Sequence, residues 1–154
     1  MNVPKLFLAS LAAATLALAF DGDNFSAKFE ALPQAVKDTA KANMDNAFPV
    51  SIASAQSAQG WNYQVNTRRD GKYHDIVIDE KGKLIAVKDE TDLAALPAPA
   101  QQAIRKQAAV SKILTLEKVT EGSHISYGAV IRDESSGSFV KLSVAPDGTV
   151  QSKN

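Results

Sequence analysis

The sequence of 154 residues contains no cysteine, only two histidines and one tryptophan. Without cysteine the chain can form no disulfide, carries no lipid on a cysteine and offers no thiol nucleophile. Two histidines and the lack of a Gly-x-Ser-x-Gly segment leave nothing on which to build an acyl-transfer triad. We therefore expect a fold held by its hydrophobic core alone, and no catalytic site.

An excess of charge of one sign is also missing, because 17 Lys and Arg residues balance 17 Asp and Glu residues. Proteins that bind nucleic acids or anionic membranes carry basic surfaces. The balance argues against both classes of partner, although it allows a local charged patch.

The chain has one long apolar run, at its amino terminus. Lys5 precedes fifteen uncharged residues, Leu6 to Phe20. A membrane-spanning helix needs about 20 apolar residues, so the run favours an export signal over a membrane anchor, and Ala17-Leu18-Ala19 matches a small-x-small cleavage pattern. We predict a signal peptide over residues 1–19, cut after Ala19, and a periplasmic or secreted protein.

The rest of the chain contains a set of landmarks that occurs twice. Leu32-Pro33 recurs 64 residues later as Leu96-Pro97, and Tyr63 recurs at the same interval as Tyr127. Each half then reaches an aspartate–glycine turn. Landmarks repeated in the same order indicate an internal repeat. We predict a flexible segment over residues 20–28, one repeat over 29–90 and a second over 91–154.

Each repeat is expected to begin with a helix, since proline is tolerated in the first helical turn and apolar residues follow Pro33 and Pro97 at helical spacing. Period-two alternation then indicates strands with one buried face. We expect strands near residues 50–56, 61–68, 73–78, 83–88, 113–120, 125–132, 139–144 and 150. The predicted fold class is α+β, with two tandem helix-plus-antiparallel-strand repeats in two layers and the helices on one face of an antiparallel sheet. Whether the strands form one sheet or two stays open.

Three motifs point to a family. Leu32-Pro33 opens a helix, Tyr63-Gln64-Val65 lies in a strand, and a hydrophobic strand ends in Asp79-Glu80-Lys81-Gly82-Lys83-Leu84. With these motifs, over about residues 29–151, the chain resembles the PepSY-like superfamily, including the variant grouped with β-lactamase-inhibitor-like proteins. The second half keeps Leu96-Pro97, Tyr127 and Pro146-Asp147-Gly148-Thr149-Val150, but has Ala129 in place of the valine.

The resemblance implies a small exported module that binds proteins through the open face of its sheet and is often discussed as restraining or inhibiting hydrolases. The secreted β-lactamase inhibitor is braced by disulfides, which this chain cannot form. Only the mode of binding is therefore carried over, and not the target.

His74 is the strongest candidate for chemistry, because Asp75 adjoins it and Asp70 and Asp79 are close in sequence. It is a candidate metal ligand or acid–base group. A metal site needs three or four converging ligands, however, and neighbouring strand residues point to opposite faces. We expect His74 to point inward, His124 to lie in a loop, and Asp75 and Asp79 to be solvated surface acids. No catalytic residue, metal or cofactor is predicted.

The outward side of the predicted sheet has an unusual composition for a solvated face, since it mixes aromatic and aliphatic residues with arginine. Such residues are enriched at the energetic centres of protein interfaces, although single apolar residues on a surface are ordinary. The predicted protein-binding residues are Tyr73, Val77, Val130 and Phe139, with Arg68 and Arg132 at the rim.

The sequence thus supports one main hypothesis and one alternative. The main hypothesis is an exported, non-catalytic PepSY-like protein-binding module whose partner is another envelope or secreted protein, with a hydrolase as the candidate target. The alternative is a periplasmic small-ligand or metal-binding module that uses His74 and nearby acids. Neither involves nucleic acid or stable insertion into a membrane.

Overall fold

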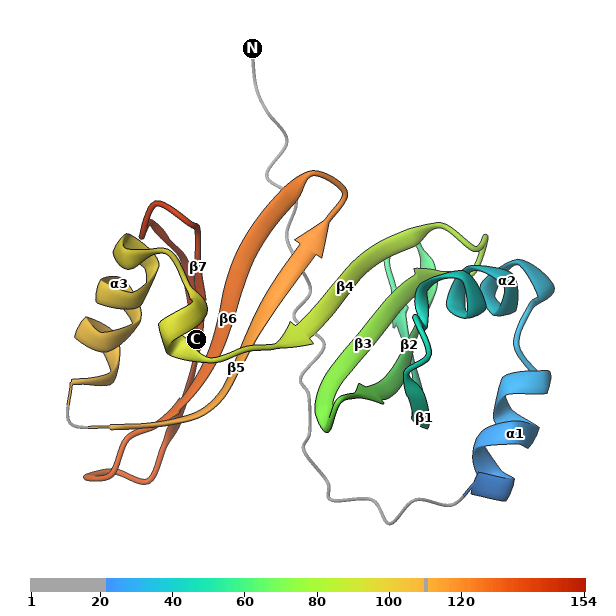
Figure 1. The fold of residues 1–154 in the computed structure, drawn as a ribbon, viewed down its shortest axis with the longest axis horizontal. Helices are drawn as coiled ribbons and strands as arrows, with labels where there is room; N and C mark the ends of the chain where they lie inside the picture. The colour runs from blue at the N-terminus through green and yellow to red at the C-terminus, as the bar shows by residue number, and fades with distance from the viewer. Residues whose placement is uncertain (1–21, 110) are drawn as a thin grey trace.

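The computed structural model describes residues 22–109 and 111–154, so the predicted signal peptide over residues 1–19 lies outside the described residues. Within the described part of the chain, no helix is long and apolar enough to cross a membrane. The elements in chain order are α1 (Gly22–Glu30), α2 (Gln34–Asn43), β1 (Phe48–Ser57), β2 (Gly60–Arg69), β3 (Lys72–Asp79), β4 (Leu84–Glu90), η1 (Leu93–Ala95), α3 (Ala98–Ala108), β5 (Lys112–Glu121), β6 (His124–Arg132), β7 (Phe139–Val144) and β8 (Val150–Lys153) (Figure 1).

The eight strands form one antiparallel sheet, in which each strand pairs with the next along the chain. The two halves are joined where β4 pairs with β5, from Val87↔Thr120 to Glu90↔Glu117. The prediction of two tandem helix-plus-strand repeats is therefore wrong: one eight-stranded sheet with three short helices runs through the described chain. The physical reason is the edge of β4, whose backbone groups would stay unpaired if the sheet ended there.

The helices form where proline and apolar spacing predict them. Pro33 directly precedes α2, and Pro97 directly precedes α3. The sequence did not predict helix α1. This helix occupies most of residues 20–28, the segment that was predicted to be flexible. Phe25 and Phe29, one helical turn apart, stack with ring centroids 5.5 Å apart, and Phe29 is buried in the core. Burial of these rings accounts for the order of α1.

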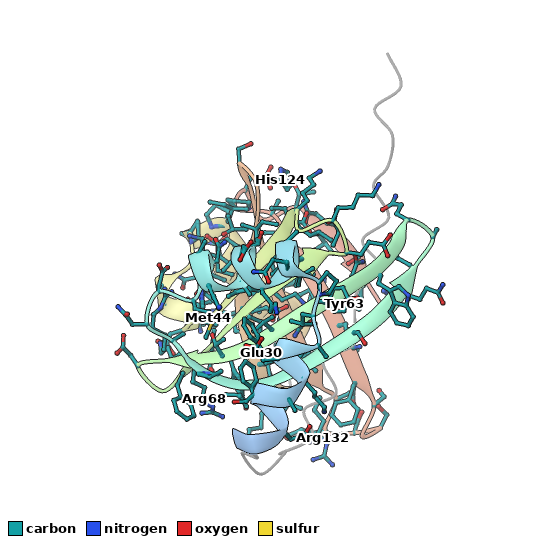
Figure 2. The ribbon with its side chains drawn as sticks, turned by 90° about the vertical axis from the view of Figure 1, so that its right-hand side faces the viewer. Glu30, Met44, Tyr63, Arg68, His124 and Arg132 are labelled. Carbon is teal, nitrogen blue, oxygen red and sulfur yellow. The ribbon has the colours of Figure 1, made fainter. Side chains whose placement is uncertain are left out.

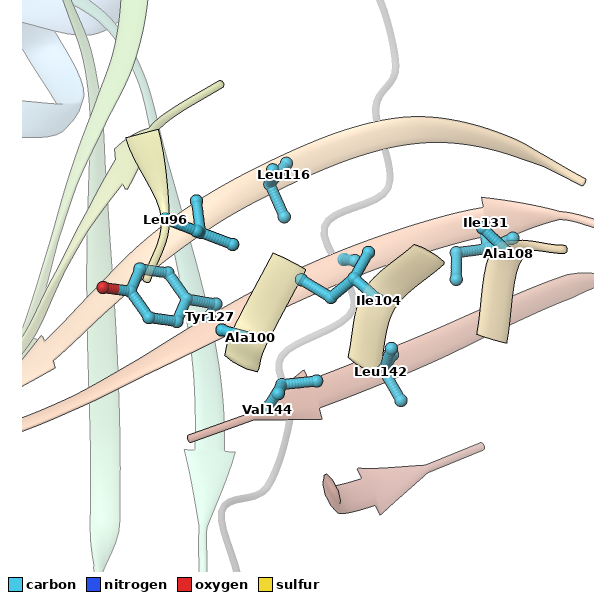
Figure 3. Packing of buried hydrophobic residues seen from close by; sticks show 10 residues of the cluster. Leu96, Ala100, Ile104, Ala108, Leu116, Tyr127, Ile131, Leu142 and Val144 are labelled. Carbon is cyan, nitrogen blue, oxygen red and sulfur yellow. The ribbon is translucent and has the colours of Figure 1, made fainter. Parts of the chain in front are cut away.

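Two clusters of buried apolar side chains separate the helices from the sheet. The cluster beneath α1 and α2 contains Phe29, Leu32, Val36, Ala40, Val65, Ile76 and Ile78. The cluster beneath α3 contains Leu96, Ala100, Ile104, Ala108, Leu116, Tyr127, Ala129, Ile131, Leu142 and Val144 (Figure 3). Fully burying an aliphatic side chain of this size stabilises a fold by about 1.5–3 kcal/mol. In a chain without cysteine, these clusters supply the main stabilising term.

The strand register shows that the covered face is continuous. Ile76 pairs with Val65 and with Val87, Val87 pairs with Thr120, and Thr120 pairs with Ile125. Residues directly opposite each other on adjacent strands share a face, so the side packed against α2 in one half is the side packed against α3 in the other. The alternate residues of each strand form a second face, on which no described helix packs. We call this second side the helix-free face.

The turn between β3 and β4 fixes α2 against the sheet. Gly82 has φ +85, and a Cβ atom there would lie 2.7 Å from the carbonyl oxygen of Ala35. Thr39 Oγ1 donates a hydrogen bond of 2.6 Å to the Gly82 carbonyl. Glycine is required because both its backbone angle and the close approach of α2 exclude a side chain. Asp79, predicted to be a solvated acid, accepts hydrogen bonds from the amides of Lys81 and Lys83 in this turn.

Candidate functional site

The helix-free face is most shielded at its centre, around β3, β4 and β5. Gln64, Ala86 and Val119 are at most 6% exposed, although no described helix covers them. The sheet turns strongly between its two halves (Figure 1), so neighbouring strands and their longer side chains exclude water from the middle. Polar groups at this centre are therefore partly desolvated, yet no other layer covers them.

Three half-buried charged residues occupy the centre, and we call them the central polar cluster: Asp75, Lys88 and Glu117. Asp75 lies directly opposite Lys88 across β3 and β4. Glu117 lies directly opposite Glu90 on β4 and Gly128 on β6. The cluster thus spans three adjacent strands and bridges the two halves of the sheet.

The carboxylate of Asp75 is only partly satisfied. Its Oδ2 atom accepts a hydrogen bond of 3.1 Å from Gln64 Nε2, which also donates to Asn66 Oδ1 at 2.7 Å. The other oxygen, Oδ1, is buried without a hydrogen-bond partner among the described residues. Burial raises the pKa of Asp75 from 3.8 to about 6, an effect that the positive charge of Lys88 partly opposes and the negative charge of Glu117 increases. The expectation of a solvated surface acid is wrong for Asp75, because the shape of the sheet removes it from water.

The carboxyl group of Glu117 is also partly desolvated. Burial raises the pKa of its carboxyl group, and Lys88 offsets part of that shift. A Cβ atom at Gly128 would lie 2.9 Å from Glu117 Oε1, so the glycine in β6 provides the space in which this carboxylate lies. Glu90, the direct neighbour of Glu117 on β4, is exposed, and its carboxylate accepts a hydrogen bond from the amide of Tyr73. Burial thus disfavours the charged forms of Asp75 and Glu117 at the centre of the face.

Four of the six predicted interface residues lie in two adjacent pairs. Arg68 Nη2 donates a hydrogen bond of 2.8 Å to the Tyr73 hydroxyl, and the guanidinium lies 4.3 Å from the centroid of the Tyr73 ring. Arg132 and Phe139 are direct cross-strand neighbours on β6 and β7. Tyr73 is 41% exposed and Phe139 is 61% exposed. Figure 2 labels both arginines, each toward the lower end of the molecule in that view.

The six predicted residues all lie on the helix-free face, but they do not form one apolar patch. Val77 is half-buried between Gln64 and Ala86, and Val130 is half-buried beside Lys141. Strands β4 and β5 separate β3 from β6, a gap of about 14 Å at the usual strand spacing. The central polar cluster fills that gap. Sequence analysis missed it because the pairing of Asp75 with Lys88, and of Glu117 with Glu90, depends on a register that the sequence does not reveal.

His74 lies on the covered face, as predicted, and is 3% exposed. Its Nδ1 atom is 2.6 Å from Asp89 Oδ1, and its Nε2 atom is 2.8 Å from the carbonyl oxygen of Asn43. Arg69 Nη2 donates to the same Asp89 oxygen at 3.0 Å. Both ring nitrogens therefore tie the end of α2 to β3 and β4. Neither nitrogen is available to a ligand, so His74, the residue on which the metal-binding hypothesis was based, is not placed to bind a metal ion.

The second histidine and the acids provide no replacement. His124, expected in a loop, is the first residue of β6 and is exposed (Figure 2). Over residues 22–109 and 111–154, no group of three or more His, Asp or Glu side chains is placed to hold a metal ion.

Comparison with solved structures supports a BLIP-like fold for this single antiparallel sheet of eight strands with helices on one face. No protein-family model matches the chain, and a search of curated proteins finds no match. Several solved structures share the fold, among them the following three. A protein described as periplasmic, from Bacteroides eggerthii, is 13% identical with a TM-score of 0.67, covering 80% of this chain and 88% of the other.

A DUF2874 family protein from Bacteroides ovatus is 15% identical with a TM-score of 0.65, over 80% of this chain and 86% of the other. A BLIP-like protein from Bacteroides fragilis is 16% identical with a TM-score of 0.60, over 80% and 85%. At these identities the likeness shows the fold alone. The resemblance to PepSY-like repeats stays a prediction.

Proposed function

We propose that this protein is an exported, non-catalytic module that binds another protein on the helix-free face of its sheet. The observation that carries the proposal is the one-sided architecture: three helices cover one face, and the opposite face of the same eight strands stays open. The open face carries exposed aromatic side chains beside arginines, and both residue types are enriched at protein interfaces. The fold shared with a BLIP-like protein supports this mode of binding.

The partner would be another envelope or secreted protein, and a hydrolase is the target class that the β-lactamase-inhibitor-like fold suggests. Tyr73 and Phe139 would supply the apolar anchors. Arg68 is already held against the ring of Tyr73, so this pair needs little ordering when a partner docks. Pre-ordered side chains lower the entropic cost of association.

The test compares partner retention by the wild type and by the Tyr73→Ala/Phe139→Ala variant in pull-downs from periplasmic extract. The matched control is Trp61→Ala, since Trp61 is an aromatic residue of similar exposure (44%) that alternates onto the opposite face. We expect a partner that the wild type and the control retain and the double variant loses. Equal recovery of every partner by all three proteins would rule the helix-free face out.

We prefer this function to small-ligand or metal binding at His74, because both ring nitrogens of His74 already bond to the protein. Native mass spectrometry with divalent metals separates the two proposals. Stoichiometric retention of one metal ion, lost in His74→Ala, would favour the alternative.

A further inference from the structure

The sheet has two edge strands, β1 and β8, and the two differ in how well they are protected. The strand β8 has four residues, and the side chain of its Lys153 donates a hydrogen bond to Gln107 on α3. The strand β1 has ten residues, and residues 50–57 contain no charge and no proline. Proteins usually protect a sheet edge by shortening it or by placing charged residues, proline or a bulge on it. Beyond Pro49 and the bulge beside it, the edge at β1 lacks these protections.

The contacts of β2 show which backbone groups of β1 point outward. Trp61 lies opposite Gln56, its amide donates to the Glu80 side chain, and its carbonyl accepts from the Glu80 amide. Both groups of Trp61 therefore point away from β1. In an antiparallel pair the residue opposite such a residue also directs its backbone groups away from the partner strand, and the pattern repeats at every second residue. The outward N–H and C=O groups thus belong to Ile52, Ser54 and Gln56, which we call the β1 edge, and no described strand pairs with them.

A hollow adjoins the β1 edge on the covered side of the sheet. It has a volume of about 370 Å³ and lies between α1, the turn to α2 and the first two strands. Its lining residues are Lys28, Ala31, Leu32, Ile52, Ser54 and Tyr63. Ile52 and Ser54 belong both to the β1 edge and to the wall of the hollow. A strand paired with β1 would direct every second side chain to this side of the sheet, next to the hollow.

Lys28 gives the hollow a positive charge. It is exposed in the last turn of α1, and it forms no ion pair with another residue of the described chain. A carboxylate on an added strand would meet this charge, and charge complementarity of that kind selects partners. A second copy of this chain fits less well, because its own β1 contains no acidic residue.

We propose that the β1 edge binds an extended peptide segment of another protein, which adds one further strand to the sheet. Backbone hydrogen bonds to Ile52, Ser54 and Gln56 would hold the segment, while one of its apolar side chains enters the hollow and an acidic side chain meets Lys28. Strand addition takes its affinity from the backbone and its specificity from side-chain pockets. This contact surface is separate from the predicted interface residues of the helix-free face, so it goes beyond the proposed function and does not depend on it.

The experiment selects binders from a phage-displayed library of linear peptides against the full chain. Selected peptides are then measured against the wild type, Ser54→Pro and Lys28→Glu. Ser54→Pro removes one outward N–H group and leaves the ladder with β2 intact, because proline is tolerated where the N–H of an edge strand faces solvent. Amide hydrogen exchange in the free and bound protein follows the three residues of the β1 edge directly.

Each substitution has a matched control elsewhere in the chain. Lys141 and Asn154 exchange both backbone hydrogen bonds, so the neighbouring Lys153 directs its backbone groups outward from β8. Lys153→Pro therefore places the same residue at the other edge of the sheet. Lys106 is an exposed lysine in the last turn of α3, and Lys106→Glu repeats the charge reversal of Lys28→Glu away from the hollow.

We expect the selected peptides to combine an apolar residue with a nearby acidic residue. Ser54→Pro should weaken their binding by about tenfold and Lys28→Glu by about threefold. Both controls, and Tyr73→Ala/Phe139→Ala, should leave binding unchanged. Bound peptide should slow amide exchange at Ile52, Ser54 and Gln56 by about tenfold or more.

A library that yields no peptide protecting these amides would overturn the inference and leave the proposed function intact, as would peptides that bind Ser54→Pro and the wild type equally. Dimerisation of the wild type in sedimentation experiments, lost in Ser54→Pro, would assign the β1 edge to a second copy and overturn the peptide. Thermal unfolding checks that each variant is folded. If Ser54→Pro fails to fold, amide protection and Lys28→Glu decide the outcome.

Discussion

The two faces of the sheet differ in how fully their buried polar groups are hydrogen-bonded. Two adjacent residues of β3, His74 and Asp75, show the difference. His74, on the covered face, has both ring nitrogens bonded to the protein. Asp75, on the helix-free face, keeps a buried oxygen without a hydrogen-bond partner in the described chain. A satisfied buried polar group is compatible with stability, whereas an unsatisfied one costs stability. The covered face thus satisfies its buried polar group, whereas the helix-free face carries the cost of an unsatisfied one.

The apolar residues differ in the same way. Ile76, next along β3, is fully buried beneath α2, whereas Val77 on the opposite face is half-buried without a covering helix. Four substitution experiments test this contrast, because each compares a residue of one face with a matched residue elsewhere.

The largest expected effect concerns the core. Ile76→Ala should lower the free energy of unfolding by about 4 kcal/mol, because it leaves a cavity in a packed cluster. Val77→Ala, one residue away, should lower it by less than about 1 kcal/mol. Urea denaturation of both variants gives the two values. Equal losses would mean that the helix-free face is packed as a core, contrary to the contrast drawn above.

The next effect concerns the bonded histidine. His74→Ala removes the ring that contacts the carbonyl oxygen of Asn43 and the carboxylate of Asp89, and it opens a void near the end of α2. We expect a loss of about 3 kcal/mol in the free energy of unfolding. The exposed His124→Ala variant should stay within about 0.5 kcal/mol of the wild type. A His74→Ala variant as stable as the His124→Ala variant would show that the hydrogen bonds of His74 contribute nothing.

The third effect has the opposite sign. Asp75→Asn keeps an acceptor for Gln64 and removes a desolvated charge. It should raise the free energy of unfolding at pH 7 by at most about 3 kcal/mol, because the pKa of Asp75 rises from 3.8 to about 6 and one pKa unit corresponds to about 1.4 kcal/mol. The control Asp70→Asn lies in an exposed turn and should leave stability nearly unchanged. Destabilisation by Asp75→Asn would show that the carboxylate is better satisfied than its contacts indicate.

The same carboxyl group sets a dependence on pH. Because its pKa rises from 3.8 to about 6 on folding, the folded state binds the proton more tightly than the unfolded state. Its contribution therefore favours folding at low pH and is lost as the pH rises from about 4 to about 6. Urea titrations across this range should show a fall for the wild type that is smaller in Asp75→Asn. An identical pH profile in both proteins would contradict the assignment to Asp75.

Much of this contrast could be predicted from alternation along the strands. The pattern Tyr73, Asp75, Val77 against His74, Ile76, Ile78 assigned each residue of β3 to the correct face, since the period of two is a property of the strand itself. Pro33 and Pro97 likewise marked the starts of α2 and α3, because proline acts locally.

What the sequence could not reveal was pairing between distant strands. One eight-stranded sheet results from hydrogen bonds between β4 and β5, and these join segments separated by η1 and α3. The partial desolvation of Asp75 results from the twist of that sheet, so a residue predicted to be a solvated surface acid is half-buried. Both properties are tertiary, and neither leaves a local pattern in the chain.

The smallest effect on stability should accompany the largest effect on binding. Tyr73→Ala/Phe139→Ala removes two exposed rings, of which Tyr73 contacts Arg68, and an exposed cation–π contact contributes about 0.5–1 kcal/mol. We expect each substitution to lower the free energy of unfolding by less than about 1 kcal/mol, while the double variant loses its partner in pull-downs. If the double variant unfolded as readily as Ile76→Ala, the two rings would belong to the core of the fold. Loss of the partner without loss of the fold would support a binding role for these two rings.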